Sequence, residues 1–329
     1  MTKKQNKNKN KNKNKELPFV SICTPTFNRR PFIPFMIKCF EHQTYPKDKM
    51  EWIIIDDGTD KIEDLVAHVP QIKYFKYDEK LYLGKKRNLA HEKSIGDIII
   101  YMDDDDYYPP MRISHAVEML QKNPKALCAG SSEMHIYFKH INQMYKFGPY
   151  GPNHSTAATF AFRRELLKQT TYEENAAIAE EKHFLKNYTI PFVQLDITKT
   201  ILVFSHIHNS FDKKIMLSNA PNQYVTSSNK TIADFIKELD LRQFYTEDVD
   251  SLLETYEPGR PENKPDVLKQ MDELQQKREK AMLEHQQQQH LLQIQPEVLI
   301  NRINEMNGII QRLLAENSEL KRRGTQVPL

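Results

Sequence analysis

The sequence predicts an α/β fold in which a mostly parallel sheet is covered by helices on both faces. Within the first 120 residues, apolar runs of strand length alternate with segments of helical spacing, which gives at least four β-α units. Three of the apolar runs end abruptly in polar or acidic residues. After about residue 210 the alternation stops and a long polar segment with helical spacing follows. We therefore expect an α/β domain with a helical C-terminal extension.

Charge and composition argue against a nucleic-acid-binding or membrane-spanning protein. Residues 1–15 carry seven of the 47 basic residues and no acidic one, so the rest of the chain has 40 basic and 44 acidic residues, a net charge of −4. No apolar run approaches the roughly 18 residues that a membrane span requires. Cys23, Cys39 and Cys128 are widely spaced and typical of reduced core residues. We expect a cytoplasmic protein with no nucleic-acid partner and no membrane span.

Shifts in composition divide the chain into four parts. Residues 1–16 are a Lys/Asn-rich tail of low complexity, which we expect to be disordered. Residues 17–210 carry the α/β alternation, and residues 211–260 form a polar extension of loops and short helices. Residues 261–329 are rich in Gln, Glu and Lys and are predicted to be a helical, coiled-coil segment.

The most informative stretch is an apolar strand, 98–102, that runs into Asp103, Asp104, Asp105 and Asp106. Neighbouring carboxylates repel by about 1 kcal/mol in water and about 4 kcal/mol at an effective dielectric constant near 20. A hard divalent cation such as Mg²⁺ or Mn²⁺ would compensate this repulsion. A solvated acidic turn before a helix is the alternative explanation, since such a helix start also favours negative charge.

Two further strands end in polar motifs of the same kind. Strand 19–24 runs into Pro25–Arg30, and strand 52–55 runs into Asp56–Thr59. In parallel sheets, ligands bind beyond the carboxyl ends of the strands, where these motifs and the acidic cluster would meet. This convergence favours the metal-site interpretation over the acidic turn.

The order and spacing of these motifs resemble the nucleotide-binding half of family 2 glycosyltransferases, which are nucleotide-diphospho-sugar transferases with the GT-A fold. The resemblance covers roughly residues 18 to 208. Its matching pieces are Ser21–Arg29, Ile55–Thr59, Gly84–Asn88 and Tyr101–Asp106, with Pro110 and Arg112 downstream. It implies a Rossmann-like mixed sheet flanked by helices. It also implies inverting, metal-dependent transfer of a sugar from a nucleotide diphosphate to an acceptor hydroxyl.

The resemblance implies nucleotide-binding roles in the first two loops. Pro25, Thr26 and Asn28 would line the base and the ribose. Asp57 would accept the imide N–H of a uracil, a donor that cytosine lacks, so the expected donor is a UDP-sugar.

The resemblance implies that Gly84–Asn88 contacts the phosphates and that Tyr101–Asp106 holds the cation, Mn²⁺ or Mg²⁺. Arg87, or Lys86 beside it, would face the diphosphate, although a solvated helix face explains a basic pair about as well. Asp103 and Asp105 would hold the metal, with Asp104 nearer the ribose. The register of this motif is open by one residue, because all four positions are Asp.

The catalytic base implied by the resemblance is Glu181, at the start of a helix where the family carries an acidic pair. Burial and the neighbouring Glu180 would raise the pKa of Glu181, which suits a base near neutral pH. The family has Asp at this position, so the longer Glu side chain changes the geometry. Strand 200–205 then leads to His206 and His208, predicted on one side of an extended segment. His208 is our candidate for completing the metal shell, with an ordinary surface pair as the alternative.

Two other segments give expectations about architecture. Residues 135–138 and 143–147 alternate like an antiparallel hairpin, which indicates that the sheet has become mixed. Near the C-terminus, apolar residues recur in steps of four and three. Their a positions are Ile303, Ile310 and Asn317, and their d positions are Leu299, Met306, Leu313 and Leu320. This pattern favours a parallel homodimer, with packing of the helix against the catalytic body as the competitor.

Other function classes are weaker or excluded. The chain has neither GxxxxGK[ST] nor GxGxxG, which excludes a P-loop kinase and a dinucleotide dehydrogenase. A sugar-nucleotide nucleotidyltransferase would show a Gly-rich loop after the first strand, and residues 16–57 contain no glycine. A non-catalytic coiled-coil assembly protein with a ligand-binding body is the remaining alternative. The acceptor, a glycan or a protein, and the donor sugar are not specified by the sequence.

Overall fold

The structure is a computed structural model that describes residues 16–218, 222–293 and 296–324. It divides into two compact units, Met1–Gln270 and Met271–Leu329. The predicted disordered tail, 1–16, lies outside the described residues apart from Glu16. The predicted domain boundaries at 210 and 260 stay predictions.

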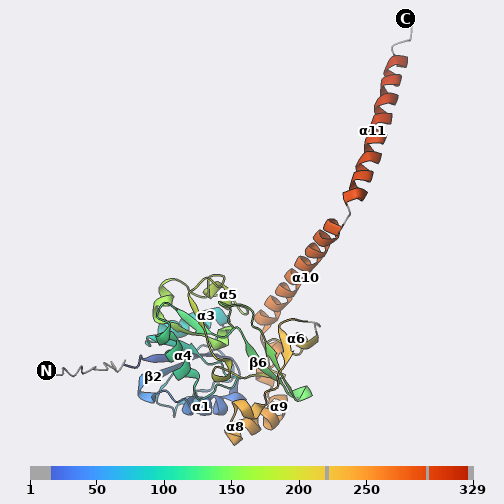
Figure 1. Cartoon of the computed structure of the whole chain (residues 1–329). Coiled ribbons are helices and arrows are strands. Elements are labelled where there is room, and N and C mark those ends of the chain that lie inside the picture. The colour runs from blue at the N-terminus through green and yellow to red at the C-terminus, as the bar shows by residue number, and fades with distance from the viewer. Residues whose placement is uncertain (1–15, 219–221, 294–295, 325–329) are drawn as a thin grey trace, which may run out of the picture. The chain divides into compact units, whose positions relative to one another are not determined.

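The first unit is built around a seven-stranded sheet with the order β3-β2-β1-β4-β8-β5-β9 (Figure 1). Its strands are β1 (Val20–Thr26), β2 (Met50–Asp56), β3 (Ile72–Lys76), β4 (Ile98–Tyr101), β5 (Cys128–Gly130), β8 (Ala161–Arg163) and β9 (Phe192–Gln194). β8 pairs antiparallel with β4 and β5, whereas the other neighbours are parallel. The predicted mixed, Rossmann-like sheet is confirmed.

Helices cover both faces of this sheet because side chains alternate along its strands. The helices that follow the first four strands are α1 (Ile33–Glu41), α2 (Glu63–Val66), α3 (Leu83–Lys93) and α4 (Arg112–Lys122). One core cluster contains Ile22, Trp52 and Ile100 together with α1 and α4. The opposite cluster contains Cys23 and Ile53 together with α3. The predicted β-α alternation is confirmed.

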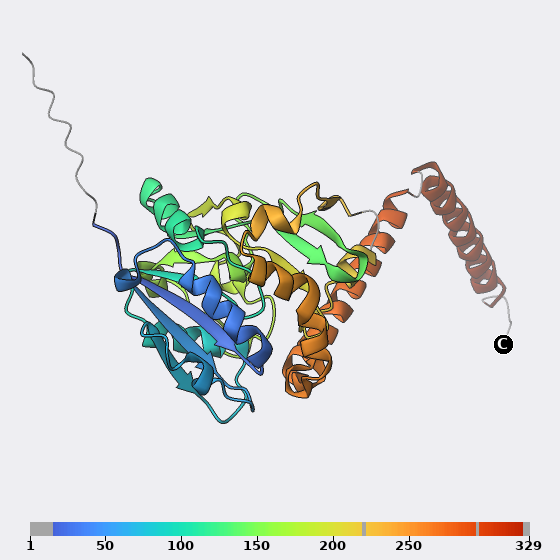
Figure 2. The same ribbon diagram turned by 90° about the horizontal axis from the view of Figure 1, so that it is seen from below.

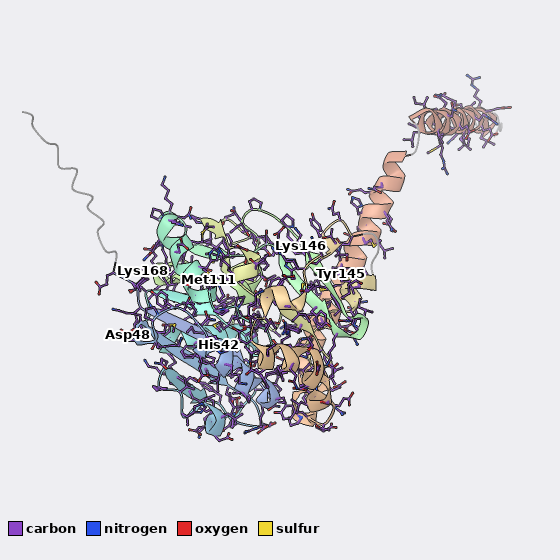
Figure 3. The ribbon with its side chains drawn as sticks, turned by 60° about the horizontal axis from the view of Figure 1, so that its bottom comes forward. His42, Asp48, Met111, Tyr145, Lys146 and Lys168 are labelled. Atoms are coloured by element: carbon purple, nitrogen blue, oxygen red, sulfur yellow. The ribbon has the colours of Figure 1, made fainter. Side chains whose placement is uncertain are left out.

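The predicted hairpin forms, but it lies in a second sheet rather than in the first. This sheet has the order β10-β6-β7-β11, with β6 (Met134–Phe138), β7 (Gln143–Phe147), β10 (Val203–Ser205) and β11 (Val225–Ser227). In Figure 2 the blue strands and the green hairpin lie on opposite sides of the domain. Tyr145 and Lys146 mark the hairpin in Figure 3. The first sheet is mixed because of β8 and not because of this hairpin.

Short helices and two long ones complete the chain. They are α5 (Glu181–Phe184), α6 (Ile215–Ser218), α7 (Ile232–Phe235), α8 (Leu239–Gln243), α9 (Val249–Glu254), α10 (Pro265–Gln293) and α11 (Pro296–Gly324). The predicted helical segment is therefore present, and Pro296 occupies the first position of α11, where proline is tolerated. Among the described residues, no helix is long and apolar enough to cross a membrane.

Candidate active site

The candidate site lies where the chain order of the large sheet reverses, between β1 and β4. The two strands are parallel and Cys23 pairs with Tyr101, so the loops after them leave the sheet side by side. Thr24 Oγ1 donates a hydrogen bond of 2.5 Å to the carbonyl of Met102, which fixes the start of the acidic segment. Such a switch point is the usual ligand site of an open α/β sheet.

Arg29 joins the first loop to the acidic cluster, a role that our sequence analysis did not assign. Its Nε lies 3.5 Å from Asp104 Oδ1 and its Nη2 lies 3.2 Å from Asp105 Oδ2. The guanidinium is buried and also donates to the carbonyl of His208 at 2.8 Å. Because these acids repel one another, the cluster requires a nearby positive charge, and the Arg29 guanidinium supplies part of that charge.

The four acids differ in their electrostatics although all are Asp. Burial, opposed by Arg29 and reinforced by Asp105, raises the pKa of Asp104 to about 7. Burial also raises the pKa of Asp103 and, together with Asp105, that of Asp106. Asp105 differs, because Arg29 and His206 overcome its burial and hold its pKa well below the usual value. Of the four acids, Asp105 is therefore the one that most readily stays ionised.

Arg87 on α3 connects the acidic cluster to the start of α5. Its Nε donates to Glu180 Oε1 at 2.8 Å, its Nη1 lies 3.7 Å from Asp103 Oδ1, and the guanidinium stacks 4.3 Å above the ring of Tyr101. Arg87 Nη1 and Asp103 Oδ1 are both buried, and neither has a hydrogen-bond partner among the described residues. Two unsatisfied groups of opposite charge in one place are the mark of a site that awaits a ligand.

Glu181 occupies the first position of α5, as predicted, and its pKa is raised to about 7 by burial and then by Glu180. These are the two causes expected from the sequence. Glu180, and not Glu181, makes the contact with Arg87. The helix itself is held by Phe184, whose ring stacks on Tyr172 at 4.4 Å.

The first two loops are tied to each other by the residues predicted to line the base. Asn28 adopts a left-handed conformation with φ of 52°, and its side-chain oxygen accepts the backbone N–H of Asp60 at 2.9 Å. Asp57 is buried and accepts from Lys86 Nζ at 2.8 Å and from the N–H of Leu81 at 2.6 Å. Thr26 Oγ1 is buried without a hydrogen-bond partner among the described residues.

The structure brings His206, rather than His208, to the acidic cluster. His206 Nε2 lies 3.3 Å from Asp105 Oδ2, whereas neither ring nitrogen of His208 has a hydrogen-bond partner among the described residues. The predicted extended segment is wrong here, because the N–H of Asn209 bonds back to the carbonyl of His206 and closes a turn. Burial lowers the pKa of His206 to about 3 and, with Arg29, that of His208 to about 4.

A cavity of about 170 Å³ collects most of these groups. It is lined by Pro25, Phe27, Arg29, Lys80, Leu81, Leu83, Lys86, Arg87, Asp103, Asp104, Asp105, Ala177, Ser210, Lys264, Asp266 and Val267. Of the predicted site residues, Pro25, Arg87 and the three acids are together in it, whereas Thr26, Asn28, Asp57, Glu181 and His208 do not line it. In the described parts of the chain, no three His, Cys, Asp or Glu side chains are arranged as a complete metal site.

A larger cavity of about 550 Å³ lies outside the acidic loops. Ala179 and Lys182, which flank Glu180 and Glu181 in the sequence, contribute to its lining together with His183. We therefore assign the candidate site to the smaller cavity, which is lined by the charged groups and by the unpartnered buried atoms of Arg87 and Asp103.

Comparison with known proteins identifies the class of this domain. Residues 21–179 match the family described as glycosyl transferase family 2. The chain carries a family 2 glycosyltransferase domain, which confirms the resemblance seen in its motifs.

Among similar curated proteins is the poly(ribitol-phosphate) beta-N-acetylglucosaminyltransferase TarS of Staphylococcus aureus, 26% identical over 116 residues. This match covers 31% of this chain and 19% of TarS. The putative teichuronic acid biosynthesis glycosyltransferase TuaG of Bacillus subtilis is 27% identical over 115 residues, which cover 32% of this chain and 43% of TuaG. The chain thus spans less than half the length of each of these two relatives.

A solved structure with a similar fold is the mannosyltransferase PcManGT from Pyrobaculum calidifontis in complex with GDP-Man and Mn²⁺. It is 18% identical, has a TM-score of 0.46, and the match covers 56% of each chain.

Proposed function

We propose that this chain is an inverting, metal-dependent glycosyltransferase that moves a sugar from a UDP-sugar to an acceptor hydroxyl. The observation that carries the proposal is the cavity in which Asp103, Asp104 and Asp105 meet Arg87 and Lys86 inside a family 2 domain. Carboxylates for a cation and basic groups for phosphates are the two requirements of a nucleotide-diphosphate site.

In this proposal the first two loops bind the nucleoside. Pro25, Thr26 and Asn28 line the base and ribose, and Asp57 accepts the imide N–H of uracil. The unpartnered hydroxyl of Thr26 is available for such a contact. Each oxygen of Asp57 accepts one hydrogen bond, from Lys86 or from the N–H of Leu81, and keeps a second lone pair for the N–H of the base.

The residues present fit a divalent cation, Mn²⁺ or Mg²⁺, held by Asp103 and Asp105. The fit rests on the buried, unpartnered Oδ1 of Asp103 and on the persistent charge of Asp105. The cation would offset the charge that develops on the leaving diphosphate. The imidazole of His206 is the nearer histidine for completing this shell, and His208 remains the alternative that the sequence suggested.

Glu181 is the proposed base that removes the proton of the acceptor hydroxyl. A carboxyl with a pKa of about 7 accepts a proton effectively near neutral pH. Glu180 and Arg87 position it, since their ion pair anchors the first turn of α5 to the acidic cluster.

A variant that removes only the basicity of Glu181 tests the catalytic assignment. We expect Glu181→Gln to bind UDP and Mn²⁺ as the unaltered chain does. Release of UDP from a UDP-sugar in the presence of acceptor should fall by about 10²- to 10⁴-fold, because general base catalysis is lost. Unchanged turnover in the variant would exclude Glu181 as the base. UDP binding without any turnover in the unaltered chain would favour a non-catalytic assembly protein.

We also propose that the chain forms a homodimer through α11. The predicted a and d positions, among them Ile303, Met306, Ile310 and Leu313, are 48–58% exposed. An exposed apolar stripe with coiled-coil spacing is stabilised when it packs against a second helix, and a second copy of α11 has a matching stripe. The acceptor of the proposed reaction is a glycan or a protein.

A further inference from the structure

The cavity that we assign to the donor is lined in part by a segment outside the family-matched residues. We call residues 256–270 the C-terminal strap. Tyr256 donates to Asp60 at 2.8 Å, and the carbonyl of Pro258 accepts from Asn28 Nδ2 at 3.0 Å. The strap therefore contacts both the loop that follows β1 and the loop that follows β2.

The far end of the strap is fastened to the other walls of the cavity. Asp266 forms an ion pair with Lys80, and Gln270 accepts from the N–H of Ala177 at 2.8 Å. Lys264, Asp266 and Val267 all line the cavity. A site built only from the family-matched residues 21–179 would lack this wall of the cavity.

Lys264 is the unusual residue of the strap. Its side chain is buried and its Nζ donates to the neutral hydroxyl of Ser210 at 2.9 Å. Every other cation that lines the cavity has a carboxylate within 4.0 Å, whereas the described residues provide none for Lys264. Burial and then the nearby Arg29 lower its pKa well below the usual value. The more distant carboxylates of Asp105 and Asp104 raise the pKa only in part, so an anion bound in the cavity would stabilise the charged form of Lys264.

Two further features make the neighbouring space suitable for an anion. Arg87 also lines this cavity, and its buried Nη1 has no hydrogen-bond partner among the described residues. The first turn of α10, a 29-residue helix that begins at Pro265, also lines the cavity, and the positive end of the helix dipole there favours negative charge.

We propose that Lys264 binds the diphosphate of the nucleotide donor from the strap, opposite Arg87. The inference rests on the proposed function and deepens it, because it names the group that Lys264 recognises. The present cavity, about 170 Å³, is smaller than the roughly 300 to 1,000 Å³ of ligand pockets. Binding of a nucleotide diphosphate would therefore require the cavity to widen, and the strap is one of the walls that could move outward.

Calorimetric titration of the full chain with UDP, and separately with uridine, in the presence of Mn²⁺ tests this role. We expect Lys264→Met to weaken UDP binding by about tenfold or more, the usual effect of losing a charge-assisted hydrogen bond. Uridine, which lacks phosphates, should bind the variant within about twofold of the unaltered chain. Lys264→Arg, which keeps the charge, should retain most of the UDP affinity. Lys269→Met, on an exposed part of the same strap, is the matched control and should change neither ligand.

Two results would overturn the assignment of Lys264. One is UDP binding by Lys264→Met that equals that of the unaltered chain. The other is an equal loss of UDP and uridine with a lower melting temperature, which would show a structural role. Failure of the proposed function is distinct, because the unaltered chain itself would then bind no UDP.

Discussion

The ion pair between Arg87 and Glu180 should be worth several kcal/mol, because both side chains are almost fully buried. Arg87 is 3% exposed and Glu180 is 5% exposed, and their atoms lie 2.8 Å apart. Removing one partner of a buried pair costs about 3 to 5 kcal/mol, since the other charge stays buried without compensation. In a domain of this size each kcal/mol lowers the melting temperature by about 2 to 4 °C, so Arg87→Met should melt about 6 to 20 °C lower.

Urea unfolding followed by tryptophan fluorescence measures this loss directly. The chain has one tryptophan, Trp52, which is buried in the large sheet and so reports the domain that contains Arg87. Lys122→Met breaks an exposed ion pair with Glu118 and serves as the control, with an expected change below about 1 kcal/mol. The reasoning is refuted if Arg87→Met loses no more stability than this control.

Two further predictions concern the base and the C-terminal helix. Because the pKa of Glu181 is raised to about 7, it is mostly protonated at pH 6, so kcat/KM should rise with pH and level off above about pH 8. A profile already flat from pH 5.5 would contradict the raised pKa. Ile310→Asp should convert the chain from dimer to monomer in light scattering, because it places a charge on the apolar stripe of α11, whereas Gln311→Asp should not. A monomeric unaltered chain would reject the dimer.

The sequence predicted the arrangement of the strand ends because that arrangement depends on local pattern. Buried strands that end in Pro25–Arg30, Asp56–Thr59 and Asp103–Asp106 must place those ends on one edge of a parallel sheet. The start of α5 at Glu181 was implied by the family resemblance, and the cause of its raised pKa was predictable because Glu180 is its sequence neighbour.

The features that sequence analysis missed depend on contacts between distant segments. Alternation revealed the β6–β7 hairpin but not its sheet, because β10 and β11 pair with it from 65 or more residues away. Arg29 was recognised only as part of a motif, since its carboxylate partners lie some 75 residues further along the chain.

The sequence did not separate the two histidines, and the reason is conformational. In an extended strand His206 and His208 would point the same way, but the turn closed by Asn209 separates them. Lys264 carries no motif at all. The composition of Pro258–Pro261 indicates a turn of the chain just before Lys264. Nothing in the local sequence indicates which cavity Lys264 lines.

The most direct test of the donor site is the melting temperature of the chain with UDP, GDP or CDP, each with and without Mn²⁺. A ligand at one hundred times its dissociation constant adds about 2.7 kcal/mol, which corresponds to a rise of about 5 to 11 °C. The proposed site predicts that UDP raises the melting temperature only with Mn²⁺ and that Asp105→Ala abolishes the effect. If no nucleotide raises the melting temperature of the unaltered chain under any of these conditions, the acidic cluster is structural and the donor site is contradicted.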